Sequence, residues 1–245
     1  MISGDLRYTI VGDFLKYVGH LRTKVDINHS LKKESKTMIR VFNKFEPIPE
    51  GFIEIDTTSR GPYKDLSPFY LGPYTWYDNG IILTCKRFEN LWQYSKVYPQ
   101  HATPDVGDLT SRRNPLRVYY EWRDIGFSKH RAERYPMGKD APKPLYTLWK
   151  GHKYRYIDAR EALYIPVYSE LVLKTESYAM LYNMVLRGEN IALRDFDGYD
   201  HINRGMTFEQ VVTNPAHSMG HAFVIYGLLT GELARFQNQR AMEFG

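Results

Sequence analysis

Short apolar runs separated by proline and glycine characterise the first part of the chain. Residues 38–42 and 52–55 form two such runs and predict a pair of strands. A third run, residues 81–83, predicts another short strand after a segment rich in Pro, Gly and Tyr. Upstream, residues 13–25 carry apolar side chains on one side of a predicted short helix, and the polar residues 28–36 predict a loop.

Helical patterns become stronger further along the chain. Residues 87–98 predict a helix that ends at Pro99, because a proline restricts the residue before it to extended conformations. Asp158 is the expected N-cap of a second helix that begins at Ala159. Pro166 should kink or restart that helix, because its ring removes a backbone donor.

Three further patterns complete the helical prediction. Residues 167–186 continue a helical pattern that stops at Gly188. Thr207 and Gln210 have the spacing of a capping box and predict another short helix. Residues 217–230 are rich in small and apolar side chains, and the glycine that follows can end their helix.

Together the patterns predict a mainly helical α+β fold with a few short strands. The chain has 245 residues, of which 43% are hydrophobic and 25% charged, so a disordered or fibrous protein is excluded. No repeat, low-complexity segment or Gly/Ser linker divides it. We therefore expect a single domain over residues 1–245, with residues 1–50 as an N-terminal helix-and-strand extension.

The composition also bears on the cellular compartment. Cys85 is the only cysteine, which excludes a disulfide framework and a cysteine-rich zinc site and favours a reducing compartment. No apolar run approaches the ~20 residues that span a bilayer, and the first residues lack the pattern of a secretory signal. We expect a cytoplasmic protein, in the host cytoplasm if a phage encodes it.

Positive charge is concentrated in one stretch. The chain carries 33 Lys and Arg against 28 Asp and Glu, a net charge of +5, and residues 129–160 alone hold nine cations against three acids. Five aromatic residues are interleaved with these cations: Tyr135, Tyr146, Trp149, Tyr154 and Tyr156. This mixture suits contacts with phosphates and stacking on bases of DNA or RNA. A solvated surface loop is the alternative, and the composition does not decide between them.

Residues 88–96 contain the first candidate for catalysis. Glu89, Gln93 and Lys96 are spaced so that they share one face of the predicted helix. A carboxylate and an amine on an otherwise aromatic helix can act as an acid/base and a nucleophile. Spacing alone favours the simpler interpretation, an exposed helix face with a weak ion pair.

A second candidate follows the apolar residues 191–193. Asp195, Asp197 and Asp200 come directly after this predicted strand, where polar side chains often form the rim of a site. The glycine and distal glutamate of a calcium loop are missing, so a calcium site is not expected. An ordinary polar turn remains the alternative.

Common metal and nucleotide motifs are absent from the sequence. His217 and His221 are four residues apart and could share a metal on a helix, but the glutamate of a zinc-protease motif does not follow His217. Capping or packing roles are therefore favoured for both histidines. The glycines form neither a P-loop nor a dinucleotide fingerprint, and we expect neither a metal nor a cofactor.

Islands of the sequence resemble the NADAR family. The islands in the first half are Leu66-Ser67-Pro68-Phe69-Tyr70, Tyr77-Asp78-Asn79-Gly80 and Phe88-Glu89-Asn90-Leu91-Trp92-Gln93-Tyr94-Ser95-Lys96. In the second half they are the Asp197–Asp200 turn and Asn214-Pro215-Ala216-His217-Ser218-Met219-Gly220, followed by an apolar helix. The similarity covers residues 52–232, which would form a NADAR-like catalytic core.

The resemblance implies hydrolysis of an N-glycosidic bond between ribose and a base or amine. Substrates in the family include ADP-ribose attached to guanine bases and phosphorylated intermediates of riboflavin synthesis. Glu89 would stabilise the positive charge that develops at C1 or act as the general acid/base. Lys96 would attack C1 of a ring-opened sugar, and Asp197 would orient water or the ribose hydroxyls.

Substrate contacts are expected from ten further positions. Arg134, Lys139 and Arg194 are candidates for the pyrophosphate, and Trp149 and Tyr70 for stacking on a base. The remaining expected contacts are Ser67, Phe69, Gln93, Asp195 and Asn214.

Two other functions remain open at this point. The candidate site residues could instead belong to a transferase that uses NAD or another nucleotide to modify nucleic-acid bases. The basic stretch would then hold the DNA or RNA. The site residues could also belong to a non-catalytic module that binds a nucleotide. No membrane partner is expected.

Overall fold

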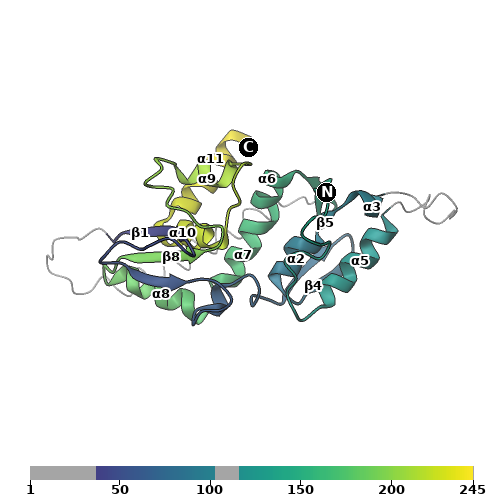
Figure 1. The fold of residues 1–245 in the computed structure, drawn as a ribbon. Helices are drawn as coiled ribbons and strands as arrows, with labels where there is room; N and C mark the ends of the chain where they lie inside the picture. The colour runs from purple at the N-terminus through teal and green to yellow at the C-terminus, as the bar shows by residue number, and fades with distance from the viewer. Residues whose placement is uncertain (1–36, 103–115, 245) are drawn as a thin grey trace. The chain divides into compact units, whose positions relative to one another are not determined.

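A computed structural model describes residues 37–102 and 116–244, and in them the chain has the predicted mixed α+β architecture (Figure 1). Three small sheets are combined with helices. The helix predicted at residues 13–25 and the loop predicted at residues 28–36 lie outside the described residues.

The first sheet has three parallel strands. β1 (Ile39–Asn43) and β2 (Ile53–Asp56) confirm the two strands predicted in this part of the chain. They do not pair with each other, because β8 (Ile191–Asp195) lies between them and pairs with both. α10 (His221–Thr230) packs against β1 and β8 and helps to bury this sheet. Residues 39–43, predicted to belong to an N-terminal extension, are thus an edge strand of the sheet.

Two antiparallel sheets accompany the helix that carries Glu89. β3 (Tyr74–Asp78) pairs with β4 (Ile81–Cys85) in a hairpin, and β5 (Lys96–Val97), β6 (Tyr146–Trp149) and β7 (His152–Tyr154) form the third sheet. β4 confirms the strand predicted at residues 81–83.

The helix predicted over residues 87–98 is shorter than expected. α2 spans Phe88–Tyr94, β5 follows it, and Pro99 begins the next helix, α3 (Pro99–Ala102), instead of ending one. α5 (Arg117–Ser128), which was not predicted, packs on α2, α3 and β4. Gly126 of α5 lies against the Tyr94 ring, and a Cβ at this glycine would approach the ring to 2.0 Å.

A long helical segment runs from residue 156 to residue 172. α6 (Tyr156–Ala159) continues into η2 (Arg160–Tyr164), which has π-helical geometry, and then into α7 (Ile165–Val172). The predicted restart at Pro166 is confirmed, since this proline lies in the first turn of α7. Asp158 is not the N-cap; it lies inside α6, whose N-cap is Arg155.

The remaining helices follow the sequence prediction more closely. α8 (Glu176–Leu186) starts after its own N-cap, Thr175, so the predicted helix 167–186 is interrupted. α9 (Phe208–Thr213) has the predicted capping box between Thr207 and Gln210. α10 begins at His221 rather than at residue 217, and α11 (Glu232–Phe244) follows Gly231, whose φ is 76°.

A short η1 helix (Lys64–Leu66) completes the set of described elements. No helix within residues 37–102 or 116–244 is both long and apolar enough to cross a membrane.

Candidate functional site

The predicted trio on residues 89–96 is connected by hydrogen bonds. Gln93 donates from Nε2 to Glu89 Oε1 at 2.8 Å, and Lys96 donates from Nζ to Gln93 Oε1 at 2.7 Å. Lys96 lies just beyond α2, in β5, so the prediction that all three share one helix is wrong for this residue. Its side chain nevertheless lies beside α2, with Nζ 4.8 Å from the centre of the Trp92 ring.

Burial changes the acidity of both ends of this trio. Glu89 is 6% exposed, and the loss of solvation raises the pKa of its carboxyl group. Burial also lowers the pKa of the Lys96 amine to about 8, although the nearby Glu89 carboxylate acts in the opposite direction. The trio therefore contains a carboxyl group that retains its proton more readily and an amine that loses its proton more readily than in water.

The turn that precedes the β3–β4 hairpin holds the start of α2. The Glu89 amide donates to the Pro68 carbonyl at 3.0 Å, and the Phe88 amide donates to the Leu71 carbonyl at 2.9 Å. These bonds satisfy backbone donors that a helix leaves unpaired at its first turn. The carbonyls of Pro68 and Leu71 thus fix the position of Glu89 through hydrogen bonds to the backbone of the first turn of α2.

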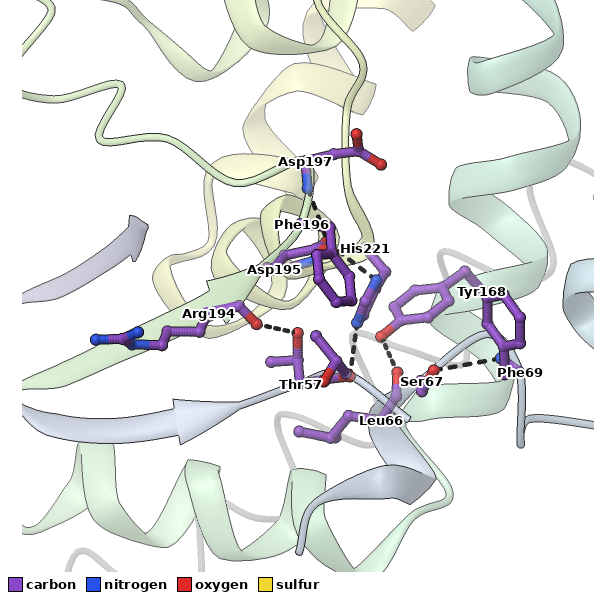
Figure 2. Close-up of polar contacts among 12 residues, drawn as sticks. Thr57, Leu66, Ser67, Phe69, Tyr168, Arg194, Asp195, Phe196, Asp197 and His221 are labelled. Carbon is purple, nitrogen blue, oxygen red and sulfur yellow. Dashed lines mark hydrogen bonds and ion pairs between the residues drawn. The ribbon is translucent and has the colours of Figure 1, made fainter. Parts of the chain in front are cut away.

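A second buried pair lies where β8 ends and α10 begins (Figure 2). His221 Nδ1 is 3.0 Å from Asp195 Oδ2, and His221 Nε2 donates to the Thr57 carbonyl at 2.8 Å. Because both ring nitrogens face acceptors, the doubly protonated imidazolium satisfies both. Desolvation alone would lower the pKa of His221, but Asp195 and the Thr57 carbonyl raise it above its ordinary value.

Asp195 is held as an anion in this pair. Burial would raise its pKa, but the charge of His221 and hydrogen bonds from the Ala222 and Asp197 amides lower it. Gly220 allows this arrangement, since a Cβ there would lie 2.1 Å from Asp195 Oδ2. The carboxylate therefore accepts a hydrogen bond from the first turn of α10, where the helix dipole also favours an anion.

Arg134 and Asp197 interact with both the Glu89–Gln93–Lys96 trio and the Asp195–His221 pair. Arg134 Nη2 is 3.3 Å from Asp197 Oδ2, and these two side chains are 40% and 37% exposed. Arg134 and His221 interact electrostatically with Glu89 and also with Asp197. Desolvation and the neighbouring Asp195 raise the pKa of Asp197. The predicted catalytic residues thus lie in one charged environment.

Tyr164 joins the same environment from η2. Its ring packs edge-on against Phe88 and Trp92, with both centroid distances at 5.1 Å. Burial and the nearby carboxylates, chiefly Glu89 and then Asp195, raise its pKa well above the ordinary value, so the hydroxyl is a neutral donor. We define the Glu89 cluster by its members: Glu89, Gln93, Lys96, Arg134, Tyr164, Asp195, Asp197 and His221.

Two residues that the sequence did not indicate hold the loops of the cluster. Asn90, fully buried on α2, donates to the Lys129 and Arg131 carbonyls and accepts from the Glu133 amide, which fixes the chain just before Arg134. Arg160 is 2% exposed and donates to four carbonyls between residues 211 and 217. It anchors the segment that leads into Gly220. Asn90 lies between Glu89 and Gln93 but was not predicted as a site residue, and nothing in the sequence singled out Arg160 or Tyr164.

Ser67 and Phe69 lie beside the cluster. The Ser67 hydroxyl accepts from the Phe69 amide at 3.4 Å, and Tyr168, whose ring is 5.8 Å from that of His221, donates to the Leu66 carbonyl next to them (Figure 2). Tyr70 is 44% exposed and lies against Lys64.

The other predicted contact residues are placed elsewhere. Arg194 pairs with Glu54 at 3.0 Å and donates to the Lys44 carbonyl, and its side chain points away from Asp197 (Figure 2). Trp149 is buried against Trp76, with 5.0 Å between ring centres. Asn214 caps α9 and accepts from the Ala216 amide. Lys139 is exposed, and no hydrogen bond or ion pair within the described residues joins it to the cluster.

The basic stretch contains one buried cation, two partly exposed cations with acidic partners, and six exposed cations. Arg160 is buried, Arg134 faces Asp197, and Lys129 pairs with Glu133 at 2.7 Å. The six exposed cations are Arg131, Lys139, Lys143, Lys150, Lys153 and Arg155. The stretch is thus partly folded core and partly charged surface.

The histidine pair predicted to share a helix does not do so. His217 precedes α10 and is exposed, whereas His221 is committed to Asp195 and Thr57. In the part of the chain that the structure describes, no three His, Cys, Asp or Glu side chains are grouped as metal ligands.

The Glu89 cluster therefore offers a proton donor, an amine of lowered pKa, a partly exposed arginine side chain and a neutral hydroxyl.

Comparisons of the chain with protein-family models, curated proteins and solved structures gave no match.

Proposed function

We propose that the Glu89 cluster is the catalytic centre of a hydrolase that cleaves the C1–N bond of a ribosyl N-glycoside. The substrate class is an ADP-ribosyl or phosphoribosyl group attached to a nucleobase or amine. The observation that carries the proposal is the hydrogen-bonded connection from the buried Glu89 through Gln93 to Lys96, both of which are partly buried.

Glu89 acts as the general acid in this proposal. Gln93 donates to Oε1 of its carboxyl group, which leaves Oε2 to carry the proton. Burial raises the pKa of this carboxyl group, which favours the protonated form that a general acid needs. Glu89 gives the proton to the ribose ring oxygen as the C1–O bond breaks, while the lone pair of the base nitrogen forms a C1=N bond.

Lys96 acts as the nucleophile on the opened sugar. Its neutral amine attacks C1, and the C1=N electron pair returns to the base nitrogen. The Glu89 carboxylate moves a proton from Lys96 Nζ to that nitrogen, and the base leaves as a neutral amine. A protonated Schiff base then joins Lys96 to the sugar. Water adds at C1 of the Schiff base and gives one proton to the Glu89 carboxylate, which restores the general acid. The proton of the new C1 hydroxyl then moves to Nζ as the C1–Nζ bond breaks, and the aldehyde sugar and the neutral Lys96 amine are released.

The exposed members of the cluster hold the substrate. Arg134 is a candidate to bind a phosphate, because its side chain is 40% exposed and its contact with Asp197 is 3.3 Å long. A phosphate at Arg134 frees the Asp197 carboxylate for a ribose hydroxyl or for water.

The test is a turnover assay on an ADP-ribosylated oligonucleotide, with released ADP-ribose measured by mass spectrometry. We expect Glu89→Gln and Lys96→Ala each to lower kcat by about 10²-fold or more, because each removes a group that acts only during the reaction. Lys174→Ala is the matched control, an exposed lysine outside both the cluster and the basic stretch of residues 129–160. Wild-type rates in both cluster variants would refute the site.

The same assay separates the proposal from the two other functions. Consumption of NAD with transfer to the oligonucleotide would instead identify a transferase. Tight binding of ADP-ribose with every substrate recovered unchanged would identify a binding module. Either result would contradict the hydrolase proposal.

A further inference from the structure

A cavity outside the Glu89 cluster lies where two hairpin turns meet helix α5. Its volume is about 270 Å³. The turn between β3 and β4 contributes Asp78 and Asn79, and the turn between β6 and β7 contributes Lys150 and Gly151. The two turns are close together, since a Cβ at Gly151 would lie 3.3 Å from the Asn79 amide nitrogen.

The walls of this cavity are aromatic. Trp76 and Trp149 pack together at 5.0 Å on one side, and Tyr120 and Phe127 come from α5, seven residues apart on one helix face. Leu83 and Leu148 complete the apolar lining. Walls of this kind suit a flat ring, because rings stack on or pack edge-on against aromatic side chains.

Polar groups of several kinds surround these walls. The Arg123 guanidinium lies 4.8 Å from the centre of the Tyr120 ring and donates from Nε and Nη2 to Asp124. Its Nη1 makes no hydrogen bond to the residues that the structure describes. Lys150 supplies another cation, Asp78 supplies an acceptor, and the Asn79 amide is both donor and acceptor. A ligand ring with both donors and acceptors on its edge matches this set.

Two residues with an unusual backbone conformation line the same cavity. Asn79 (φ 49°) and Lys150 (φ 47°) are the only non-glycine residues with positive φ in the described part of the chain, and both line it. Asparagine adopts this conformation readily in a hairpin turn, but lysine does so at a cost. The turn thus retains a charged side chain at a position that glycine would occupy more easily.

We propose that this cavity binds a single nucleobase carried by a phosphate-bearing nucleotide. Its volume lies just below the range of about 300–1,000 Å³ that accommodates drug-sized ligands, which suits one ring system. The aromatic walls contact the base, Arg123, Asp78 and Asn79 bind its edge, and Lys150 contacts the phosphate. Ser95 lines the cavity and is followed directly by Lys96, so the two sites are neighbours in the chain.

The first test locates binding with the indole signals of the four tryptophans. The full chain, labelled with ¹⁵N-tryptophan, is titrated with AMP, dTMP or ribose 5-phosphate, and the signals are assigned with single Trp→Phe variants. We expect saturable shifts at Trp76 and Trp149 with the nucleotides and smaller shifts at Trp92, which lies beside the Glu89 cluster. Ribose 5-phosphate should shift neither Trp76 nor Trp149. No shift with any nucleotide, or shifts confined to Trp92, would overturn the proposal.

Variants then test the polar groups. Lys150→Gly removes the ammonium while easing the backbone, and Arg123→Gln removes the guanidinium; each should weaken nucleotide binding by about tenfold, as expected for a lost hydrogen bond to a charged group. Lys153→Ala, on the same hairpin but outside the lining, should stay within about twofold. Equal affinity in Lys150→Gly, Arg123→Gln and wild type would contradict the proposal.

Two comparisons identify the source of the base and separate this site from the hydrolase. A short oligothymidylate that binds about tenfold or more tightly than dTMP would identify a nucleic-acid strand as the source, and equal affinity would identify a free nucleotide. Both results support the cavity. Glu89→Gln should leave the shifts at Trp76 and Trp149 unchanged, so a failure of the proposed hydrolysis leaves this test intact.

Discussion

Tyr164 and Tyr168 lie one turn apart with nearly parallel rings, yet their hydroxyls have different surroundings. Tyr168 donates to the Leu66 carbonyl at 2.6 Å, whereas Tyr164 has no hydrogen-bond partner within the described residues and interacts with the carboxylates of the Glu89 cluster. If the cluster is the proposed catalytic centre, a neutral hydroxyl in this position would donate a hydrogen bond to the substrate.

We therefore expect opposite effects from two equivalent substitutions. Tyr164→Phe should lower kcat/KM for the glycoside by about 10–100-fold while the melting temperature stays within a few degrees. Tyr168→Phe should leave turnover nearly unchanged and destabilise the fold by about 1–2 kcal/mol, because the Leu66 carbonyl loses its buried donor. Loss of stability without loss of turnover in Tyr164→Phe would assign this residue a purely structural role.

The Asp195–His221 pair makes stability depend on pH. The pKa of His221 is raised above its ordinary value of 6.5. Its contribution to the free energy of unfolding is therefore complete below pH 6.5 and is lost as the pH rises through the pKa of the folded state. The pKa of Asp195 is lowered from its ordinary value of 3.8. Its contribution to the free energy of unfolding is therefore complete above pH 3.8 and is lost as the pH falls through the lowered pKa of the folded state. The pair therefore stabilises the fold most between these limits.

Chemical denaturation across this pH range tests the pair. His221→Gln should cost about 3 kcal/mol at pH 6, since it leaves Asp195 buried without its counter-ion, and the cost should shrink as the pH rises above 6.5. Asp195→Asn combined with His221→Gln is the control without either charge. A cost that is the same at pH 6 and pH 9 would show that His221 is not a cation in the fold.

At the scale of elements, the start of α10 depends on a glycine. Because a Cβ at Gly220 would lie 2.1 Å from Asp195 Oδ2, Gly220→Ala must displace either the carboxylate or the helix. We expect a loss of about 2–3 kcal/mol and a further loss of turnover. Ser218→Ala, at an exposed position of the same segment, should change neither. Thermal unfolding of both variants makes the comparison, and an unchanged Gly220→Ala protein would contradict the described contact.

The elements also show what local sequence can predict. The capping box at Thr207 and the strands at residues 39–43 and 53–56 depend on neighbouring residues and are confirmed. The insertion of β8 between β1 and β2 depends on residues more than 130 positions away, so the sequence suggested the wrong pairing. Lys96 leaves the helix for β5 because Thr147 of β6 pairs with it, which no local pattern indicates.

At the scale of the whole chain, the cluster is assembled from distant segments. Glu89 comes from α2, Arg134 from a loop fixed by Asn90, and Asp197 from the end of β8. The sequence predicted Glu89, Gln93, Lys96, Arg134, Asp195 and Asp197 as site residues, and the structure places them together. Tyr164 and the Asp195–His221 pair were not predicted, because only the folding of η2 and α10 brings them to the cluster.

The central claim is that Lys96 attacks the sugar within this assembled cluster, and covalent trapping tests it most directly. The protein is incubated with ADP-ribosylated oligonucleotide, reduced with borohydride, digested and mapped by mass spectrometry. We expect one reduced sugar adduct, on Lys96, which is absent from Lys96→Ala and diminished in Glu89→Gln. Release of ADP-ribose without any adduct on Lys96, or an adduct of equal yield on exposed lysines such as Lys153, would contradict the claim.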